Sequence, residues 1–103
     1  MIISVLTPDR TIFTGNISSL TLPGTEGMFQ VLDNHAPLVA SLSAGRVELT
    51  TAAGAFQYYD SEAEAMAEDG TPNRRLTFSI DRGFVEVLNN EVNLLVQGAR
   101  NVR

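Results

Sequence analysis

His35 is the chain's one histidine, and its side chain has the widest chemical range of any in the sequence. An imidazole can bind a metal or act as a general base near neutral pH, and Asp33 lies two residues before it. A zinc site needs at least three protein ligands, and the chain has no cysteine to supply a thiolate. We therefore expect a structural role, with the ring bonded to a neighbouring backbone group. Contact with a partner protein is the main alternative.

The other side chains that could take part in catalysis lack suitable neighbours. Ser18 and Ser19 have only His35 to serve as a base in a nucleophile–base arrangement. The carboxylates of Glu62 and Glu64 lie in the stretch with the weakest structural pattern, where an acid–base pair would not be held in place. The sequence therefore predicts a non-catalytic protein with no metal and no cofactor.

Two features could in principle bind a phosphate or another anion. The PGTEG run at residues 23–27 is glycine-rich, but it lacks the Lys-Ser/Thr of a phosphate-binding loop and precedes a strand-like segment. Arg74 and Arg75 are adjacent in a loop-like stretch and could grip an anion, although such pairs are usually solvated. Neither feature predicts a phosphate site by itself.

The length and composition are those of a single globular domain. The chain has 103 residues, 44% of them hydrophobic, and a net charge of −5. It contains no lysine and no basic stripe that could neutralise phosphates, which argues against nucleic acid as a partner. No segment approaches the ~20 apolar residues of a membrane span, and the N-terminus does not resemble a signal peptide. We expect contact with a membrane only through a partner.

The acidic residues are concentrated in one stretch. Five acids and no base lie within residues 60–69, namely Asp60, Glu62, Glu64, Glu68 and Asp69. Ser61, followed by Glu64 three residues later, resembles a helix cap, so one or two helical turns are expected over residues 61–69. We interpret residues 60–75 as an exposed excursion, with its charge either solvated or directed at a partner.

The rest of the chain reads as short β-strands with alternating apolar residues. Val47 and Leu49 alternate with Arg46 and Glu48, and a similar alternation runs through residues 76–81. Turn signals recur every eight to twelve residues; one, Gly15-Asn16, is expected to be a turn or a bulge, and another, Asn89-Asn90, fits a two-residue hairpin. The pattern predicts an all-β antiparallel sandwich, or flattened barrel, of about ten short strands over residues 1–97, with a frayed tail at residues 98–103.

Residues 23–38, PGTEGMFQVLDNHAPL, form the central stretch of the sequence. Gly24 and Gly27 bracket a tight turn. Phe29 and Val31 then alternate with residues on the opposite face of a short strand. A second turn follows at residues 33–35. The stretch therefore predicts a turn, a strand and a second turn.

The order of these motifs resembles the N-terminal half of the ATP synthase epsilon subunit over most of residues 4–97. The resemblance rests on the following matches: Thr7-Pro8 with Phe13 and Gly15; PG-x-EG-x-F-x-V-L-x-x-HAPL from Pro23 to Leu38; L-x-x-G-x-V from Leu42 to Val47; and GFVEV from Gly83 to Val87. It implies a sandwich of two antiparallel sheets that occupies the rotating central stalk and couples proton flow to ATP synthesis. It also implies a peripheral location on the cytoplasmic face of the bacterial inner membrane.

The resemblance also implies which residues meet which partner. The turn made by Thr25, Glu26, Gly27 and Met28 would face the c-ring, and the segment made by His35, Ala36, Pro37 and Leu38 would face the gamma subunit. The family continues into a C-terminal helical hairpin that binds ATP in some members. Because the sequence stops at Arg103, the expectation is that it has neither the hairpin nor a bound nucleotide.

The alternative from another functional class is a free-standing β-sandwich module that binds a small ligand or a sugar at the His35 turn. Such modules usually carry an exposed aromatic platform or a concave pocket. Tyr58 and Tyr59 are the candidates, but adjacent strand residues point to opposite faces. A deep pocket at His35 would favour this alternative.

Overall fold

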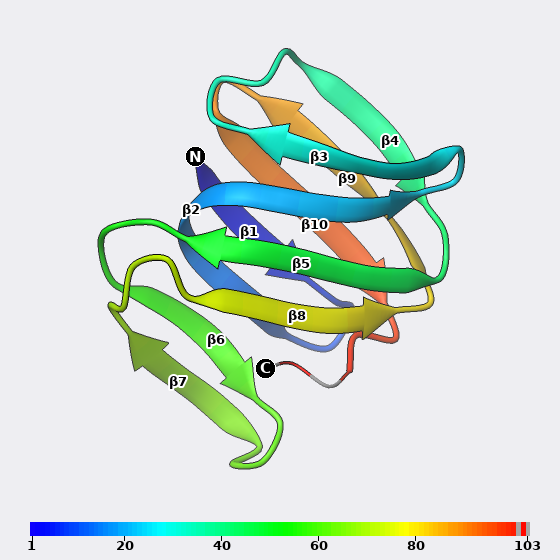
Figure 1. The fold of residues 1–103 in the computed structure, drawn as a ribbon. Helices are drawn as coiled ribbons and strands as arrows, with labels where there is room; N and C mark the ends of the chain where they lie inside the picture. The colour runs from blue at the N-terminus through cyan, green and yellow to red at the C-terminus, as the bar shows by residue number, and fades with distance from the viewer. Residues whose placement is uncertain (101, 103) are drawn as a thin grey trace.

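The computed structural model describes residues 1–100 and 102, and within these residues it contains ten β-strands and no helix (Figure 1). The strands are β1 (Ile2–Leu6), β2 (Thr11–Gly24), β3 (Gly27–Leu32), β4 (Leu38–Leu42), β5 (Gly45–Thr51), β6 (Phe56–Asp60), β7 (Ala65–Asp69), β8 (Arg75–Ile80), β9 (Arg82–Leu88) and β10 (Glu91–Gln97). Among the described residues, no helix is long and apolar enough to span a membrane.

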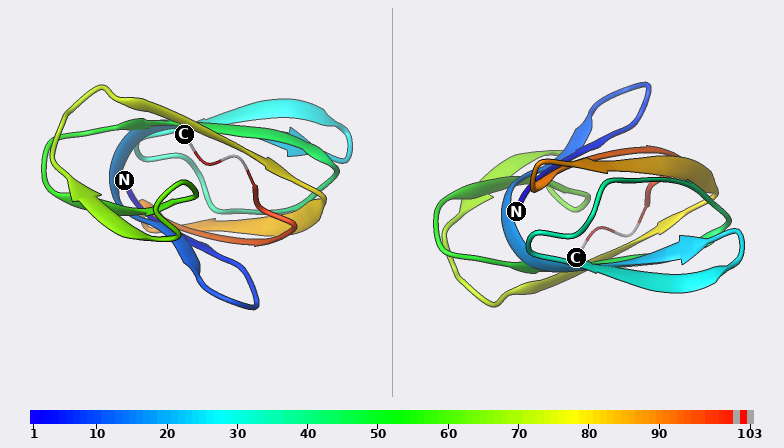
Figure 2. Two further views of the ribbon diagram at one scale, coloured as in Figure 1. Left: turned by 90° about the horizontal axis from the view of Figure 1, so that it is seen from below. Right: turned by 90° about the horizontal axis from the view of Figure 1, so that it is seen from above.

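The strands form two layers that face each other across the core (Figure 2). One layer, called here the β5 layer, has the order β3-β2-β5-β8, and the other, the β9 layer, has the order β4-β9-β10-β1. The long strand β2 belongs to both, because its first part pairs with β1 and its second part with β3 and β5. The all-β sandwich predicted from the sequence is confirmed, with one exception to its antiparallel pairing: β1 and β10 are parallel.

The core lies between the layers and is built from the alternating residues that the sequence indicates. Val47 and Leu49 of β5 are buried, as are Leu76, Phe78 and Ile80 of β8. Each fully buried side chain of this kind contributes about 1.5–3 kcal/mol through its removal from water. The hairpin at Asn89-Asn90 is also confirmed, with both residues at positive φ, as this two-residue turn requires.

The expected turn or bulge at Gly15-Asn16 is wrong, since both residues lie inside the continuous strand β2. Gly15 allows the chains to approach closely, because a Cβ there would lie 2.4 Å from the Cβ of Phe56. The irregularity falls one step later, between Ile17 and Ser19, where the register with β5 shifts. This shift lets Ile17 and Leu20 both point into the core despite their odd spacing.

The expected helical turns at residues 61–69 are also wrong. Residues 61–64 form a turn in which Asp60 accepts hydrogen bonds from two backbone N–H groups, and Glu64 has a φ of 53°. Ala65–Asp69 then forms β7, which pairs with β6 along its whole length. Ala and Glu are good helix formers, but helix propensity is worth less than about 1 kcal/mol per residue, and pairing with β6 overrides it. The excursion is therefore largely a β-hairpin that projects from the sandwich (Figure 1).

The tail is not frayed at Arg100. The backbone of Arg100 exchanges two hydrogen bonds of 3.0 Å with Ser79 of β8, and its guanidinium pairs with Asp81 at 2.8 Å. Val102 is buried. The chain after β10 therefore crosses to the β5 layer and packs there, while residues 101 and 103 lie outside the described part of the structure.

Candidate protein-docking site

The turn of residues 25–28 closes the β2–β3 hairpin at one end of the sandwich. Gly24 and Gly27 are directly opposite each other, and Gly27 has a φ of 125°, which favours glycine. The N–H of Thr25 donates to the carbonyl oxygen of Ser41 at 3.1 Å and so ties the turn to β4. Glu26 is exposed and Met28 is 61% exposed. The turn therefore presents one acidic and one apolar side chain to the surroundings.

His35 has the structural hydrogen bond expected from the sequence. Its Nδ1 lies 2.8 Å from the carbonyl oxygen of Ala36, so that nitrogen carries the proton and donates. The backbone N–H of His35 donates to Leu32 at 3.2 Å. The turn before it is tied down by Asn34, whose N–H donates to the Asn90 side chain at 2.8 Å and whose φ is 61°.

The two predicted surfaces lie at opposite ends of β3, about 17 Å apart for five steps of about 3.4 Å each. A cleft of about 520 Å³ nevertheless connects parts of both, because residues 25–28 and Leu38 line it together with Phe29 and Val39. His35, Ala36 and Pro37 do not line this cleft. Among the described residues, no group of three or more His, Cys, Asp or Glu side chains could hold a metal ion.

One apolar surface was not anticipated from the sequence. It lies on the outer face of the β9 layer and is called here the apolar face. Leu6, Leu95 and Phe84 form one cross-strand row on it, and a groove of about 790 Å³ runs beside that row. Its other exposed apolar members are Ile2, Val39 and Leu88. The signal was present in Phe84 and Leu88, which are apolar at the positions that alternate with the buried Val85 and Val87.

Over β5 and β8 the outer face of the β5 layer is polar, in contrast to the apolar face, although Met28 and Leu32 of β3 are exposed at its edge. Thr21, Glu48 and Thr77 form one cross-strand row there. Arg75 pairs with Glu48 at 3.0 Å on the same surface. Sheet faces that contact only water normally carry polar residues of this kind. The apolar face therefore marks the side of the sandwich where a protein partner would bind.

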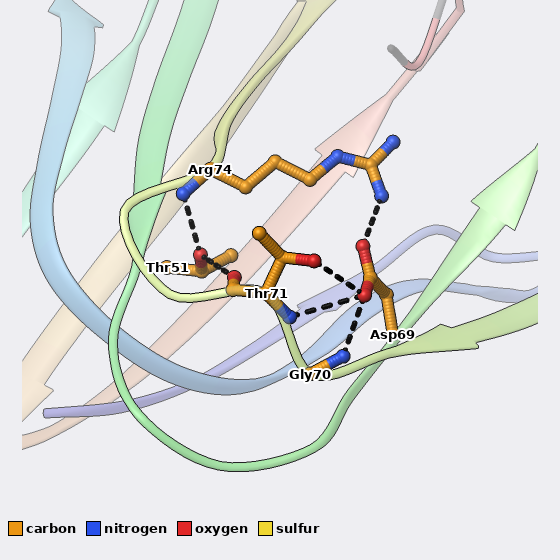
Figure 3. Close-up of polar contacts among 5 residues, drawn as sticks. All are labelled: Thr51, Asp69, Gly70, Thr71 and Arg74. Atoms are coloured by element: carbon orange, nitrogen blue, oxygen red, sulfur yellow. Dashed lines mark hydrogen bonds and ion pairs between the residues drawn. The ribbon is translucent and has the colours of Figure 1, made fainter.

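The charged side chains at the base of the β6–β7 hairpin bond to each other and to neighbouring groups of the chain (Figure 3). Asp69 accepts hydrogen bonds from the hydroxyl and N–H of Thr71 and from the N–H of Gly70, and pairs with Arg74 at 2.7 Å. The Thr71 hydroxyl, followed by Arg74, lowers the pKa of Asp69 from 3.8 to about 2. Arg74 also lies over the ring of Tyr58, with its Cζ 4.7 Å from the centroid. These groups hold the hairpin to the sandwich and leave no free anion-binding arginine at Arg74.

Comparison with known proteins identifies the family. A family described as "ATP synthase, Delta/Epsilon chain, beta-sandwich domain" matches residues 1–60. The ATP synthase epsilon chain of Chlorobaculum tepidum is 36% identical over 92% of this chain and 86% of its own length. The chain belongs to the ATP synthase epsilon chain family. The epsilon chain of Leptospira borgpetersenii is 32% identical over 90% of this chain but only 58% of its own length, so this chain spans little more than half of that relative.

Solved structures agree with this epsilon-chain fold. A chain in the central stalk/c-ring structure of the Tetrahymena thermophila mitochondrial ATP synthase superposes with a TM-score of 0.68 at 15% identity, covering 98% of this chain and 66% of that one. A chain of the Euglena gracilis mitochondrial ATP synthase superposes with a TM-score of 0.70 at 18% identity, covering 97% of this chain and 52% of that one. At these identities the likeness shows the sandwich fold.

Proposed function

We propose that this epsilon-type sandwich is a non-catalytic subunit of the central stalk of a bacterial F-type ATP synthase. It links the gamma subunit to the c-ring and thereby couples proton flow to ATP synthesis. The observation that carries the proposal is the difference between the two outer faces: one has a cross-strand apolar row beside a groove, whereas the other is polar over β5 and β8. Family membership supplies the assembly in which such a face has a partner.

We assign the gamma subunit to the apolar face. The segment of residues 35–38, already expected to face gamma, leads directly into β4, and Val39 is 72% exposed on the apolar face. Glu86 lies beside Val39 in the sheet, and Glu91 lies opposite Leu88. A partner that fits this surface needs apolar side chains with basic residues between them. Burial of the apolar side chains supplies the free energy, and the charges fix the orientation.

We assign the c-ring to residues 25–28. This turn is at the end of the sandwich, and none of its residues lines the groove beside Phe84, so the c-ring would contact side chains that the groove does not use. Its anchor to Ser41 keeps the turn from folding away under load. The subunit would then transmit torque as a rigid body and would occupy the cytoplasmic face of the inner membrane through its partners.

Binding to the purified gamma subunit tests this proposal. The folded chain should bind gamma with a dissociation constant in the micromolar range or tighter, and should co-purify with it. Absence of binding at micromolar concentrations, with the chain shown to be folded by its circular dichroism spectrum, would refute the proposal. His35 lines neither the groove beside Phe84 nor the cleft beside residues 25–28. The alternative of a ligand-binding module at the His35 turn therefore has no observation in its favour.

A further inference from the structure

The strand β3 has one unpaired edge. It pairs with β2 along one side, and no other strand among the described residues pairs with it. The closing pair of a two-residue hairpin is hydrogen-bonded, and pairs then alternate along the ladder. Phe29 therefore bonds to β2, whereas the backbone groups of Met28 and Gln30 point away from it. The carbonyl of Pro23, opposite Met28, agrees with this register, because it accepts from Ser43 rather than from β3.

The strand β4 faces this edge with an unpaired edge of its own. It touches β2 only where Leu42 lies opposite Gly24. The carbonyl of Ser41 points away from β9, since it accepts from Thr25. By the alternation of the ladder, the backbone of Val39 points the same way. Beyond the turn of residues 25–28, β3 and β4 therefore each have a free edge, and the cleft of about 520 Å³ lies between these two edges.

The core is open at this side of the sandwich. Phe29, Leu38 and Ala40 pack against the core, yet each remains only partly buried. Corresponding inward residues in the middle of the layers, such as Leu20 and Val85, are fully buried. A long free edge with apolar side chains around it is a template for adding another strand.

We propose that an extended segment of the gamma subunit enters this cleft and adds a strand to the free edge of β3. The inference rests on the proposed function, because it takes the partner assigned to the apolar face and extends that interface. Val39 belongs both to the apolar face and to the cleft, so a partner seated on the face reaches β3 without a gap. Backbone hydrogen bonds to Met28 and Gln30 would fix the register, as in other cases of strand addition.

The side chains around the cleft define the chemistry of the added segment. Apolar residues would cover Phe29 and Leu38, which the sandwich leaves partly open. Glu26, at the turn end, is exposed and has no ion pair within the described residues. Glu26 therefore stays available to the c-ring, to which the turn is assigned, and the segment would contact the backbone edge of β3 and the apolar side chains that face β4.

Substitution of Gln30 separates backbone from side-chain contributions. Gln30→Pro removes the N–H that points to the free edge but leaves the ladder to β2 intact, and Gln30→Ala keeps that N–H. We expect Gln30→Pro to weaken gamma binding roughly tenfold, the loss of one hydrogen bond and of close approach, and Gln30→Ala to bind within about twofold of the wild type. Equal binding by the proline variant and the wild type would overturn the inference.

Amide hydrogen exchange of the unaltered chain gives an independent result should the proline variant fail to fold. On saturation with gamma, the amides of Met28 and Gln30 should exchange more slowly. The amide of Thr77 is the control, because it lies on β8, outside the cleft, and points away from β5, as the amide of Ser79 does where it bonds Arg100. Unchanged exchange at Met28 and Gln30 with gamma bound would overturn the inference and leave the proposed function standing. Failure of gamma to bind would overturn both. If the amides of Met28 and Gln30 are already protected in the isolated chain and its mass is that of a dimer, the free edge of β3 pairs with a second copy of the chain, and the inference is overturned.

Discussion

The substitution Phe84→Ala measures how much the apolar face contributes to binding. Phe84 is 47% exposed on the outer face of β9 and lies beside Leu95. Its removal takes away a surface that the proposed gamma subunit would cover. Because half of the ring already contacts water in the free chain, the fold should lose far less than the ~3–5 kcal/mol typical of a buried phenylalanine.

The expected loss of binding follows from the exposed area. A phenylalanine side chain has about 150–250 Å² to bury, so the 47% left exposed corresponds to roughly 90 Å². At about 25 cal/mol per Å², covering that area is worth about 2 kcal/mol. Phe84→Ala should therefore raise the dissociation constant for gamma roughly 30-fold.

Met66→Ala provides the matched control. Met66 is 45% exposed, close to the value for Phe84, but lies on the β6–β7 hairpin away from the apolar face. Calorimetric titration with purified gamma should give a dissociation constant within about twofold of the wild type for this variant. The reasoning is refuted if Phe84→Ala binds as tightly as the wild type while folded, or if Met66→Ala weakens binding equally.

Three further predictions concern single positions. Met28→Asp should change the free energy of unfolding by no more than about 0.5 kcal/mol, because Met28 is 61% exposed, but should reduce ATP-driven proton pumping by the assembled complex; a large stability loss in urea unfolding would show that Met28 is part of the core. Gly83→Ala should destabilise the fold by about 1–3 kcal/mol, because a Cβ there would lie 2.3 Å from the carbonyl oxygen of Leu95. Gly70→Ala, where a Cβ meets nothing within 4 Å, should be nearly neutral. Equal melting temperatures for the Gly83→Ala and Gly70→Ala variants would contradict this. Asp69 should stabilise the fold above its unfolded pKa of 3.8 and lose that contribution as the pH falls towards its folded pKa of about 2, so the urea midpoint of Asp69→Asn should vary less over this pH range than that of the wild type, and an unchanged pH dependence would refute the assignment.

The alternation of apolar and polar residues was enough to predict the strand and its buried side chains wherever a strand has one buried face. Val47 and Leu49 point inward because Arg46 and Glu48 need water, and the paired strand β8 follows the same rule. The expected helical turns at residues 61–69 were wrong because local helix preference and strand pairing disagree there. Ala and Glu favour a helix by less than about 1 kcal/mol per residue, whereas pairing with β6 runs along the whole length of β7.

The docking surface was harder to predict because it depends on neighbours distant in sequence. Leu6, Phe84 and Leu95 come from three strands and form a row only through the β1–β10 and β9–β10 registers. The turns at both ends of β3 could be located from Gly27 and Asn34, whose positive φ values their residue types allow. That the turn and β4 enclose one cleft depends on the Thr25–Ser41 hydrogen bond, which no local pattern encodes.

Cysteine protection tests most directly the claim that gamma covers the apolar face. The natural chain has no cysteine, so Phe84→Cys and Thr77→Cys each introduce a single thiol, one on the apolar face and one on the polar face. The rate of alkylation is measured for each variant with and without saturating gamma subunit. The account predicts that gamma slows alkylation at position 84 and leaves position 77 unchanged. Protection at position 77, with position 84 still reactive, would contradict it.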